Sequence, residues 1–247
     1  MSDEKALISD LFGAKPVSEA VGHIMKSGFD GGKAFLSAIC MPAAQEFGLL
    51  LQDKVKNFRA NNAQKMLGKA QILYLQLPNP DSKHAPPRIV KAIVENGSWT
   101  DDDDIQSMWA GLLATSCTES GLDDENLIYV NMLAQLTSAQ VRLLNYICEN
   151  ASTIMSNSGL LIAREKQVER DQLLKISGLN DIHILDFMVE GLRSLGLISV
   201  DSGMSLVMPD YNSLAPSIMA LHLYVRSKGH AGTAISYFKP DVGKLPF

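Results

Sequence analysis

The sequence predicts a mainly α-helical protein, in which an N-terminal helical domain is followed by a winged-helix-like domain with a short β-hairpin. Two patterns support this fold class. Apolar residues recur at three- and four-residue steps along most of the chain, which is the period of an amphipathic helix. After residue 137, three such segments precede two short strand-like runs, and this is the element order of a winged helix. We therefore assign a helical domain to residues 1–136, a winged-helix-like domain to residues 137–228 and an irregular C-terminal tail to residues 229–247.

The composition is typical of a folded protein. Hydrophobic residues make up 46% of the 247 residues and charged residues 20%, so the chain can bury a core. A net charge of -5 does not favour a nucleic-acid partner. Cys40, Cys117 and Cys148 lie far apart, which suits neither a metal site nor a disulfide framework. We expect three free thiols in a reducing cytoplasm, and the charged N-terminus does not resemble a signal peptide.

The first half of the predicted helical domain contains a glycine-rich turn and a long helix. The turn is at Gly28–Lys33, and the nearly uncharged segment Ala34–Leu51 follows it. Because this segment contains Pro42 and Glu46, we interpret it as buried or interfacial rather than membrane-spanning. A helix is expected to start at Pro42 and to end before Leu77–Pro80, where two prolines stop it.

Three shorter helices are expected in the rest of this domain. A short one covers Pro87–Glu95 and is closed by Asn96 and Gly97. The acidic run Asp101–Asp104 precedes the next helix, and we expect it to cap the free N–H groups of that helix rather than to bind calcium. A third helix is expected at Glu125–Leu136.

The winged-helix-like domain should begin with three helices, continue with two strands and end with a further helix. A tight turn with a glycine separates the second and third helices, as in a helix-turn-helix unit. The expected helices are Ser138–Ala151, Arg164–Ser177, Ile182–Leu195 and Ser213–Lys228, and the expected strands are Leu197–Val200 and Ser205–Met208.

Charge is segregated along the first domain. Residues 54–91 contain eight basic residues and one acidic residue, a net charge of +7, whereas residues 92–141 contain nine acidic residues and no basic one. One interpretation is a basic helix that binds an anionic surface, either nucleic acid or lipid. The other, which we favour, is that the two blocks attract each other across a fold or an oligomer interface, or are solvated faces. The candidate anion-binding residues, which do not share one helical face, are Lys54, Lys56, Arg59, Lys65 and Lys69.

Catalytic and metal-binding motifs are absent from the sequence. It contains no G-x-S-x-G, Walker, G-x-G-x-x-G or H-E-x-x-H pattern. His183 and Asp186 could share a helical face, but two ligands are too few for a metal site. We therefore expect a protein that is not an enzyme and has no catalytic residue, cofactor or metal.

The third helix of the expected winged unit is acidic. Asp181 lies just before it, and Asp186 and Glu190 lie within it, against a single arginine, Arg193. A helix that reads the major groove of DNA should present Arg, Lys, Asn or Gln. We expect this helix to pack against protein rather than to read DNA.

Three successive segments resemble the abortive infection alpha (Abi-alpha) family of phage-defence proteins, over roughly residues 36–225. The first segment, Pro42–Ala70, has the family's small-residue start, Glu and Gly, Asp-Lys pair and aromatic-Arg pair. The second, Pro86–Ala114, has a proline-led helix, an acidic run and a helix with Trp and two Leu. The third is Leu133–Ile147, with a Gln-Leu-Thr step. The matching residues are Ala43, Ala44, Glu46, Gly48, Asp53, Lys54, Phe58, Arg59, Asp101–Asp104, Trp109, Leu112 and Leu113.

The resemblance implies a role in phage defence together with a partner. Because catalytic spacing is missing and the winged unit is acidic, we expect a non-enzymatic component, a sensor or adaptor that binds a phage component, a partner effector protein or both. Two alternatives stay open. One is an effector peripheral to the inner membrane that binds or perturbs anionic lipid, because the nearly uncharged segment Gly28–Leu51 precedes a basic helix. The other is a winged-helix DNA-binding regulator. The opposite charges of the two blocks would also suit a homo-oligomer.

Overall fold

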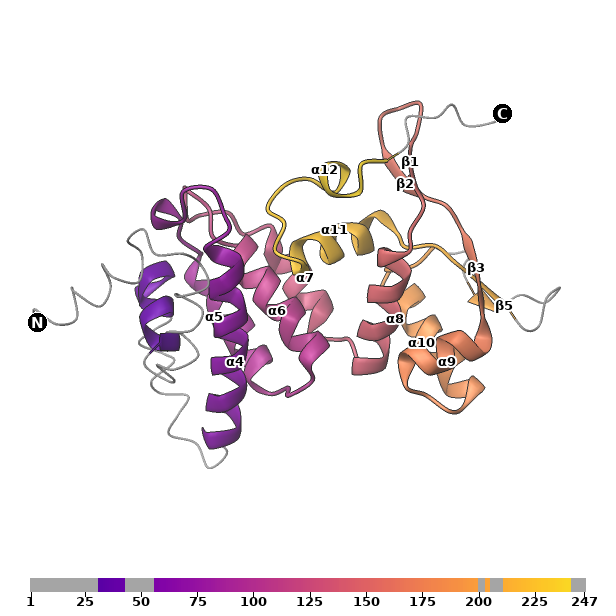
Figure 1. The fold of residues 1–247 in the computed structure, drawn as a ribbon, viewed down its shortest axis with the longest axis horizontal. Helices are drawn as coiled ribbons and strands as arrows, with labels where there is room; N and C mark the ends of the chain where they lie inside the picture. The colour runs from indigo at the N-terminus through magenta and orange to yellow at the C-terminus, as the bar shows by residue number, and fades with distance from the viewer. Residues whose placement is uncertain (1–30, 43–55, 200–202, 205–210, 241–247) are drawn as a thin grey trace, which may run out of the picture. The chain divides into compact units, whose positions relative to one another are not determined.

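A computed structural model describes residues 31–42, 56–199, 203–204 and 211–240 of the chain (Figure 1). It is mainly helical with two small antiparallel sheets among these residues, which confirms the predicted fold class at that level. The chain forms two compact units. Unit 1 contains the residues up to Ala134 together with Ser227–Gly229, and unit 2 contains Gln135–Arg226 and the chain from His230 onward.

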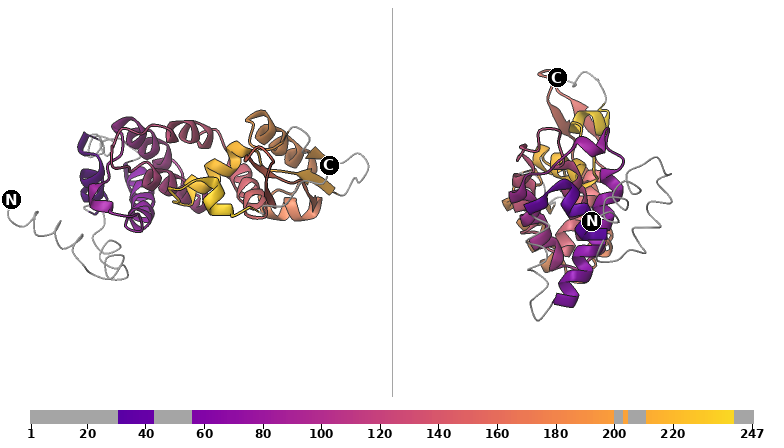
Figure 2. Two further views of the ribbon diagram at one scale, coloured as in Figure 1. Left: turned by 90° about the horizontal axis from the view of Figure 1, so that it is seen from above. Right: turned by 90° about the vertical axis from the view of Figure 1, so that its left-hand side faces the viewer.

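Unit 1 is a helical bundle around one buried helix. Helix α6 is buried along almost its whole length, from Ile105 to Thr115, and α4 and α5 lie beside it (Figures 1 and 2). The sequence of this segment is apolar almost without interruption, so the helix must be covered on several sides. The elements are a helix at residues 31–39, α4 (Lys56–Tyr74), the 3-10 helix η1 (Pro80–Ser82), α5 (Pro87–Ser98), α6 (Asp103–Thr115) and α7 (Asn126–Leu133).

Two predicted helix ends in unit 1 are confirmed and others are wrong. Residues 31–33, predicted as part of a turn, belong to the helix at residues 31–39, and α7 ends at Leu133 rather than at Leu136. α4 ends at Tyr74, before the prolines, and the Asp102 side chain caps α6 by accepting from the N–H groups of Asp104 and Ile105. α5 does not close at Asn96 and Gly97 but continues to Ser98. Gly97 permits close packing instead of ending the helix, because a Cβ at this position would overlap the Met66 sulfur.

The described part of unit 2 combines five helices with a three-stranded antiparallel sheet, in which the strand order is β3-β5-β4. Figure 1 shows β3 and β5 of this sheet. A separate two-stranded hairpin, β1 and β2, lies between the first helix and this sheet in the sequence. The elements are α8 (Ser138–Glu149), β1 (Thr153–Met155), β2 (Leu161–Ala163), β3 (Lys166–Glu169), α9 (Arg170–Ser177), α10 (Ile182–Ser194), β4 (Gly203–Met204), β5 (Tyr211–Leu214), α11 (Ile218–Ser227) and α12 (Ala234–Phe238).

Two helices of unit 2 begin later than predicted, for the same reason. They were predicted at Arg164–Ser177 and Ser213–Lys228 but begin at Arg170 and Ile218. Residues Lys166–Glu169 form β3 and pair with Tyr211–Leu214 of β5, with Val168 opposite Asn212. This pairing joins segments that are more than forty residues apart in sequence. Local periodicity contains no information about such a partner, so the first residues of both segments were wrongly predicted to be helical. The hairpin β1–β2 was not predicted.

The expected strands and the expected irregular tail are also revised. Ile198 forms only an isolated bridge to Pro216, while β4 lies at Gly203–Met204, and residues 205–208 are outside the described residues. The tail contains the short helix α12, capped by the Thr233 hydroxyl, so the prediction of irregular structure is wrong there. Its Phe238 ring stacks on buried Tyr224 with 6.2 Å between ring centroids, and this apolar packing stabilises the added turn.

The start of α8 is fixed against α10 inside unit 2. Thr137 and Gln140 form a capping box at the N-terminus of α8, and the Gln140 Nε2 donates to the carbonyl oxygen of Met188 at 3.2 Å. Gly191 lets Gln140 come this close, because a Cβ there would clash with Nε2. α10 itself begins and ends within one residue of the prediction and is capped by Asp181, whose carboxylate accepts from His183 and Ile184 N–H.

Candidate protein-interaction surface

Arg59, the central member of the predicted anion-binding set, is used inside unit 1. Its side chain is almost fully buried, and Nε donates to the Ser98 hydroxyl at 3.1 Å. Nη2 lies 2.9 Å from the Glu95 carboxylate, and the guanidinium carbon lies 4.4 Å from the centroid of the Trp99 ring. A charge that is paired, stacked and shielded in this way joins α4 to the end of α5.

Two further ion pairs link the basic and acidic blocks. Lys69 Nζ lies 2.6 Å from Asp103 Oδ1 and also donates to the Ser107 hydroxyl at 2.9 Å. Lys83 Nζ lies 3.8 Å from Glu119 Oε1. With Arg59 and Glu95, each of the three pairs joins a base from residues 54–91 to an acid from residues 92–141. The two blocks therefore attract each other within unit 1, as the second interpretation of the charge pattern expects.

Of the three other candidate cations, the structure describes the side chain of one. Lys65 is exposed on α4, whereas Lys54 and the side chain of Lys56 lie outside the described residues. Anion binding by the five residues stays a prediction, but Arg59 and Lys69 already have internal partners. In the apolar segment before α4, Phe35, Leu36 and Ile39 are buried in unit 1.

The three cysteines of the chain are buried. Cys40, Cys117 and Cys148 are free thiols. Burial raises the pKa of the Cys117 thiol to about 12, with a further contribution from Cys40, so the thiol stays protonated at neutral pH. Over the ranges that the structure describes, no three His, Cys, Asp or Glu side chains could hold a metal ion together, and no helix is long and apolar enough to cross a membrane.

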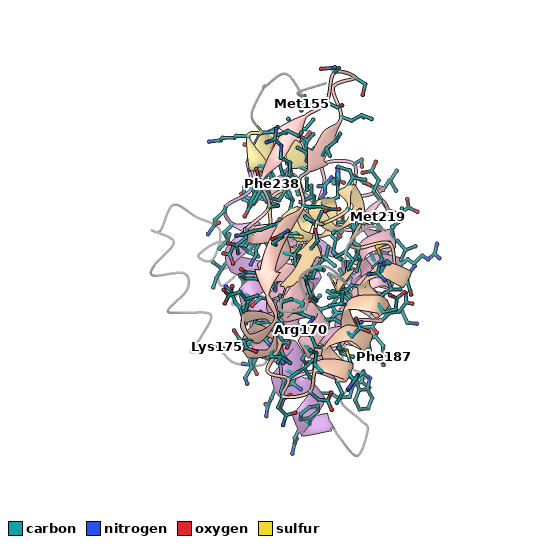
Figure 3. The ribbon with its side chains drawn as sticks, turned by 90° about the vertical axis from the view of Figure 1, so that its right-hand side faces the viewer. Met155, Arg170, Lys175, Phe187, Met219 and Phe238 are labelled. Atoms are coloured by element: carbon teal, nitrogen blue, oxygen red, sulfur yellow. The ribbon has the colours of Figure 1, made fainter. Side chains whose placement is uncertain are left out.

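A different surface stands out in unit 2, on the outer side of α10. The inner side buries Leu185, Val189 and Leu192. On the other side, Phe187 is 70% exposed and Ile184 is 44% exposed. Figure 3 shows Phe187 at the edge of the molecule. We call this surface the α10 face; its exposed residues are His183, Ile184, Phe187, Glu190 and Ser194.

Acidic side chains lie in the α10 face and beside it. Asp186 and Glu190 are exposed on the same helix, and Asp181 is exposed at its start. The one arginine of the helix, Arg193, pairs with Glu190 one turn away. An exposed aromatic side chain with acids around it suits the burial of apolar surface against a protein and opposes the approach of phosphate.

A family model described as abortive infection alpha matches residues 53–228, which is more than half of the chain. The chain belongs to the Abi-alpha family. The predicted resemblance is thereby confirmed, with a later start than residue 36. No curated protein and no solved structure matches the chain.

The Abi-alpha match runs from the segment before α4 to the end of α11, so it includes both the three ion pairs of unit 1 and the α10 face of unit 2. Sequence reasoning identified the acidic character of α10 but missed Ile184 and Phe187. The sequence alone could have revealed these two residues. On a helical wheel, Leu185 and Val189 lie in one apolar stripe, which is enough to bury the helix on one side, and Ile184 and Phe187 fall outside that stripe.

Proposed function

We propose that this Abi-alpha protein is a component of a bacterial abortive-infection defence that acts without catalysis, as a sensor or adaptor. In this proposal, the α10 face of unit 2 binds a protein, either a partner effector or a phage component. Membership of the family supports the defence role. The exposure of Phe187 and Ile184 on one helix supports the binding role, because large exposed apolar side chains in a cluster are typical of protein-binding surfaces.

We also propose that unit 2 is a winged helix. The order α8, β3, α9, α10, β4 and β5, with β3 paired to β5 and β5 to β4, supports this assignment. The hairpin β1–β2 would then be an insertion between the first helix and the first strand. In this assignment α10 takes the place of the helix that enters the major groove in DNA-binding winged helices.

The single observation that most favours a protein partner over DNA is the 70% exposed ring of Phe187 on that helix. Reading a base edge requires hydrogen-bonding groups such as those of Arg, Asn or Gln. At this position the helix instead offers an apolar ring beside Asp186 and Glu190, whose charges repel phosphate. Burial of an aromatic ring against a protein, in contrast, supplies favourable free energy directly.

The test uses the full-length chain in a phage-sensitive host. Phe187→Ala should lose both protection in a plaque assay and a specific protein captured with the tagged chain during infection. Leu160→Ala is the matched control, because Leu160 is also a large exposed apolar residue of unit 2 but lies in the β1–β2 hairpin loop. Both variants should melt like wild type. Equal protection and equal capture by wild type and Phe187→Ala would contradict the proposal.

DNA binding is the second candidate function, because the element order of unit 2 favours a winged helix. A gel shift with mixed-sequence duplex DNA across a range of salt concentrations tests it. We expect no shift at physiological salt, given the acidic α10 face. A salt-dependent shift that Asp186→Lys strengthens would instead support the DNA-binding regulator.

A further inference from the structure

Helix α7 of unit 1 is apolar on more sides than it buries. Asn126, Val130 and Leu133 are buried and form its inner side. On the other side, Ile128 is 55% exposed, and Leu127 and Met132 are half-buried. The exposed Asn131 also lies on this side, so the outer side of α7 is largely but not wholly apolar. Within the part of the chain that the structure describes, the outer side of α7 is left partly open to solvent.

A further large apolar side chain, Leu122, is 83% exposed in the loop that leads into α7. The loop has defined hydrogen bonds: the Leu122 N–H donates to the Ser120 hydroxyl at 3.2 Å, and the Gly121 N–H donates to the Thr118 carbonyl at 3.2 Å. Thr118 in turn forms a β-bridge with His84. An exposed leucine in a loop held in this way loses little freedom when it binds, which favours recognition.

We call Leu122, Leu127, Ile128 and Met132 the α7 face. It is held at a defined position, because Asn126 on the inner side ties α7 to the end of α6. The Asn126 Nδ2 donates to the Thr115 hydroxyl at 3.0 Å and to the Ser116 hydroxyl at 2.9 Å, and the side chain is buried. A rigid apolar helix surface is suited to packing against a second helix.

The charge next to the α7 face is negative. Asp123, Asp124 and Glu125 stand between Leu122 and the helix, and Asp124 and Glu125 are exposed. No basic residue occurs anywhere from residue 92 to residue 141. An occupant must therefore provide apolar side chains for the face and positive charge for its acidic border.

We infer that the α7 face docks a basic amphipathic helix of a second protein. Such a helix offers apolar residues on one side and Lys or Arg on the other, which complements both parts of the surface. A second copy of this chain that docked by the same face would bring like charges together, and nucleic acid or anionic lipid would be repelled. The inference does not depend on the α10 face; only its consequence, that an adaptor could hold one partner on each unit, rests on the proposed function.

The experiment uses the full-length chain and a fluorescein-labelled synthetic peptide of about 18 residues, roughly five helical turns, with Leu on one face and Lys on the other. A second peptide has Glu in place of every Lys. Fluorescence anisotropy should show binding of the Lys peptide alone. Ile128→Ser should weaken binding about tenfold, because the transfer of one isoleucine from water is lost.

The matched control is Ile162→Ser, because Ile162 is an isoleucine of similar exposure on β2 of unit 2. It should leave the dissociation constant unchanged, and so should Phe187→Ala on the α10 face. In methyl-labelled protein, the Met132 signal should shift on addition of the Lys peptide, whereas that of buried Met108 should not. Ile128→Ser should melt like wild type, since the side chain is largely exposed.

Four results would overturn the inference: no binding of the Lys peptide, equal binding of the Glu peptide, an unchanged dissociation constant for Ile128→Ser, or a wild-type dimer in sedimentation that Ile128→Ser dissociates. The last would assign the face to a second copy.

If Phe187→Ala alone removes peptide binding, the peptide occupies the α10 face, so this inference fails while the proposed function stands. If the α7 results hold but Phe187→Ala keeps full protection against phage, the proposed role of the α10 face fails alone.

Discussion

The guanidinium of Arg59 lies over the ring of Trp99, 4.4 Å from its centroid, and the same arginine pairs with Glu95 one turn earlier on α5. One side chain thus holds the N-terminal part of α4 to the C-terminal end of α5. Both tryptophans of the chain, Trp99 and Trp109, belong to unit 1. Intrinsic tryptophan fluorescence therefore reports the unfolding of this unit.

Replacement of Arg59 should destabilise unit 1. Arg59→Ala removes a buried charge-assisted contact, a cation–π contact and a hydrogen bond to Ser98, so we expect the free energy of unfolding to fall by about 2–3 kcal/mol. Arg59→Lys should recover only part of this loss, because an ammonium group cannot stack and pair as a planar guanidinium does. Urea denaturation followed by tryptophan fluorescence measures the free energy of unfolding of both variants.

The control is Lys65→Ala, an exposed change on the same helix. Its free energy of unfolding should stay within about 0.5 kcal/mol of wild type, and a loss equal to that of Arg59→Ala would contradict a specific role for Arg59.

Two glycine-to-alanine changes in unit 1 should have opposite effects. Gly68 lies inside α4 with no atom within 4 Å of an added Cβ, so Gly68→Ala should stabilise the unit by about 0.5–1 kcal/mol through a better helix propensity. A Cβ at Gly111 of α6 would overlap the backbone carbonyl of Ser227, and Gly111→Ala should cost about 2 kcal/mol or more. Thermal denaturation of both variants distinguishes them. Stabilisation by both would mean that Ser227 does not lie against α6.

Asn126 should be required for the attachment of α7. Asn126→Leu keeps the approximate volume but removes the donors to Leu112, Thr115 and Ser116, and we expect a loss of about 2 kcal/mol in the free energy of unfolding. Hydrogen exchange should show faster exchange of the α7 amides in this variant than in wild type. Ile128→Ser, a change on the exposed side of the same helix, should leave those exchange rates unchanged. Similar exchange in all three proteins would show that Asn126 does not position α7.

The stability of unit 1 should fall at high pH. Burial raises the pKa of Cys117 from an ordinary value of 9.0 to about 12, and that of Tyr74 from 10.0 to about 12. Because the unfolded groups lose their protons first, the stabilisation is complete below about pH 9 and is lost as the pH rises through 12. Cys117→Ala should reduce this loss in denaturation measured between pH 8 and pH 11. At pH 8, a thiol reagent should modify Cys117 only after denaturant is added, and rapid modification of the folded protein would contradict the burial.

The local sequence was sufficient for most helices. α6 and α10 each begin after an aspartate that caps the first N–H groups, Asp102 and Asp181, and their apolar residues recur with the helical period. The order of segments was also sufficient for the family, which the match over residues 53–228 confirms. The helices and their caps depend on residues only a few positions apart, because helix hydrogen bonds and caps close within about four residues.

The tertiary structure alone decided three other features. Lys166–Glu169 became a strand because β5 pairs with it, Arg59 became an internal contact because Glu95 and Trp99 lie beside it, and Phe187 and Ile128 became surface residues because no described segment covers them. Helical periodicity identifies which side of a helix is apolar, but not whether another segment packs on that side. Strand pairing, ion pairing and burial join residues that are far apart in sequence, so they are set by the packing of the whole unit.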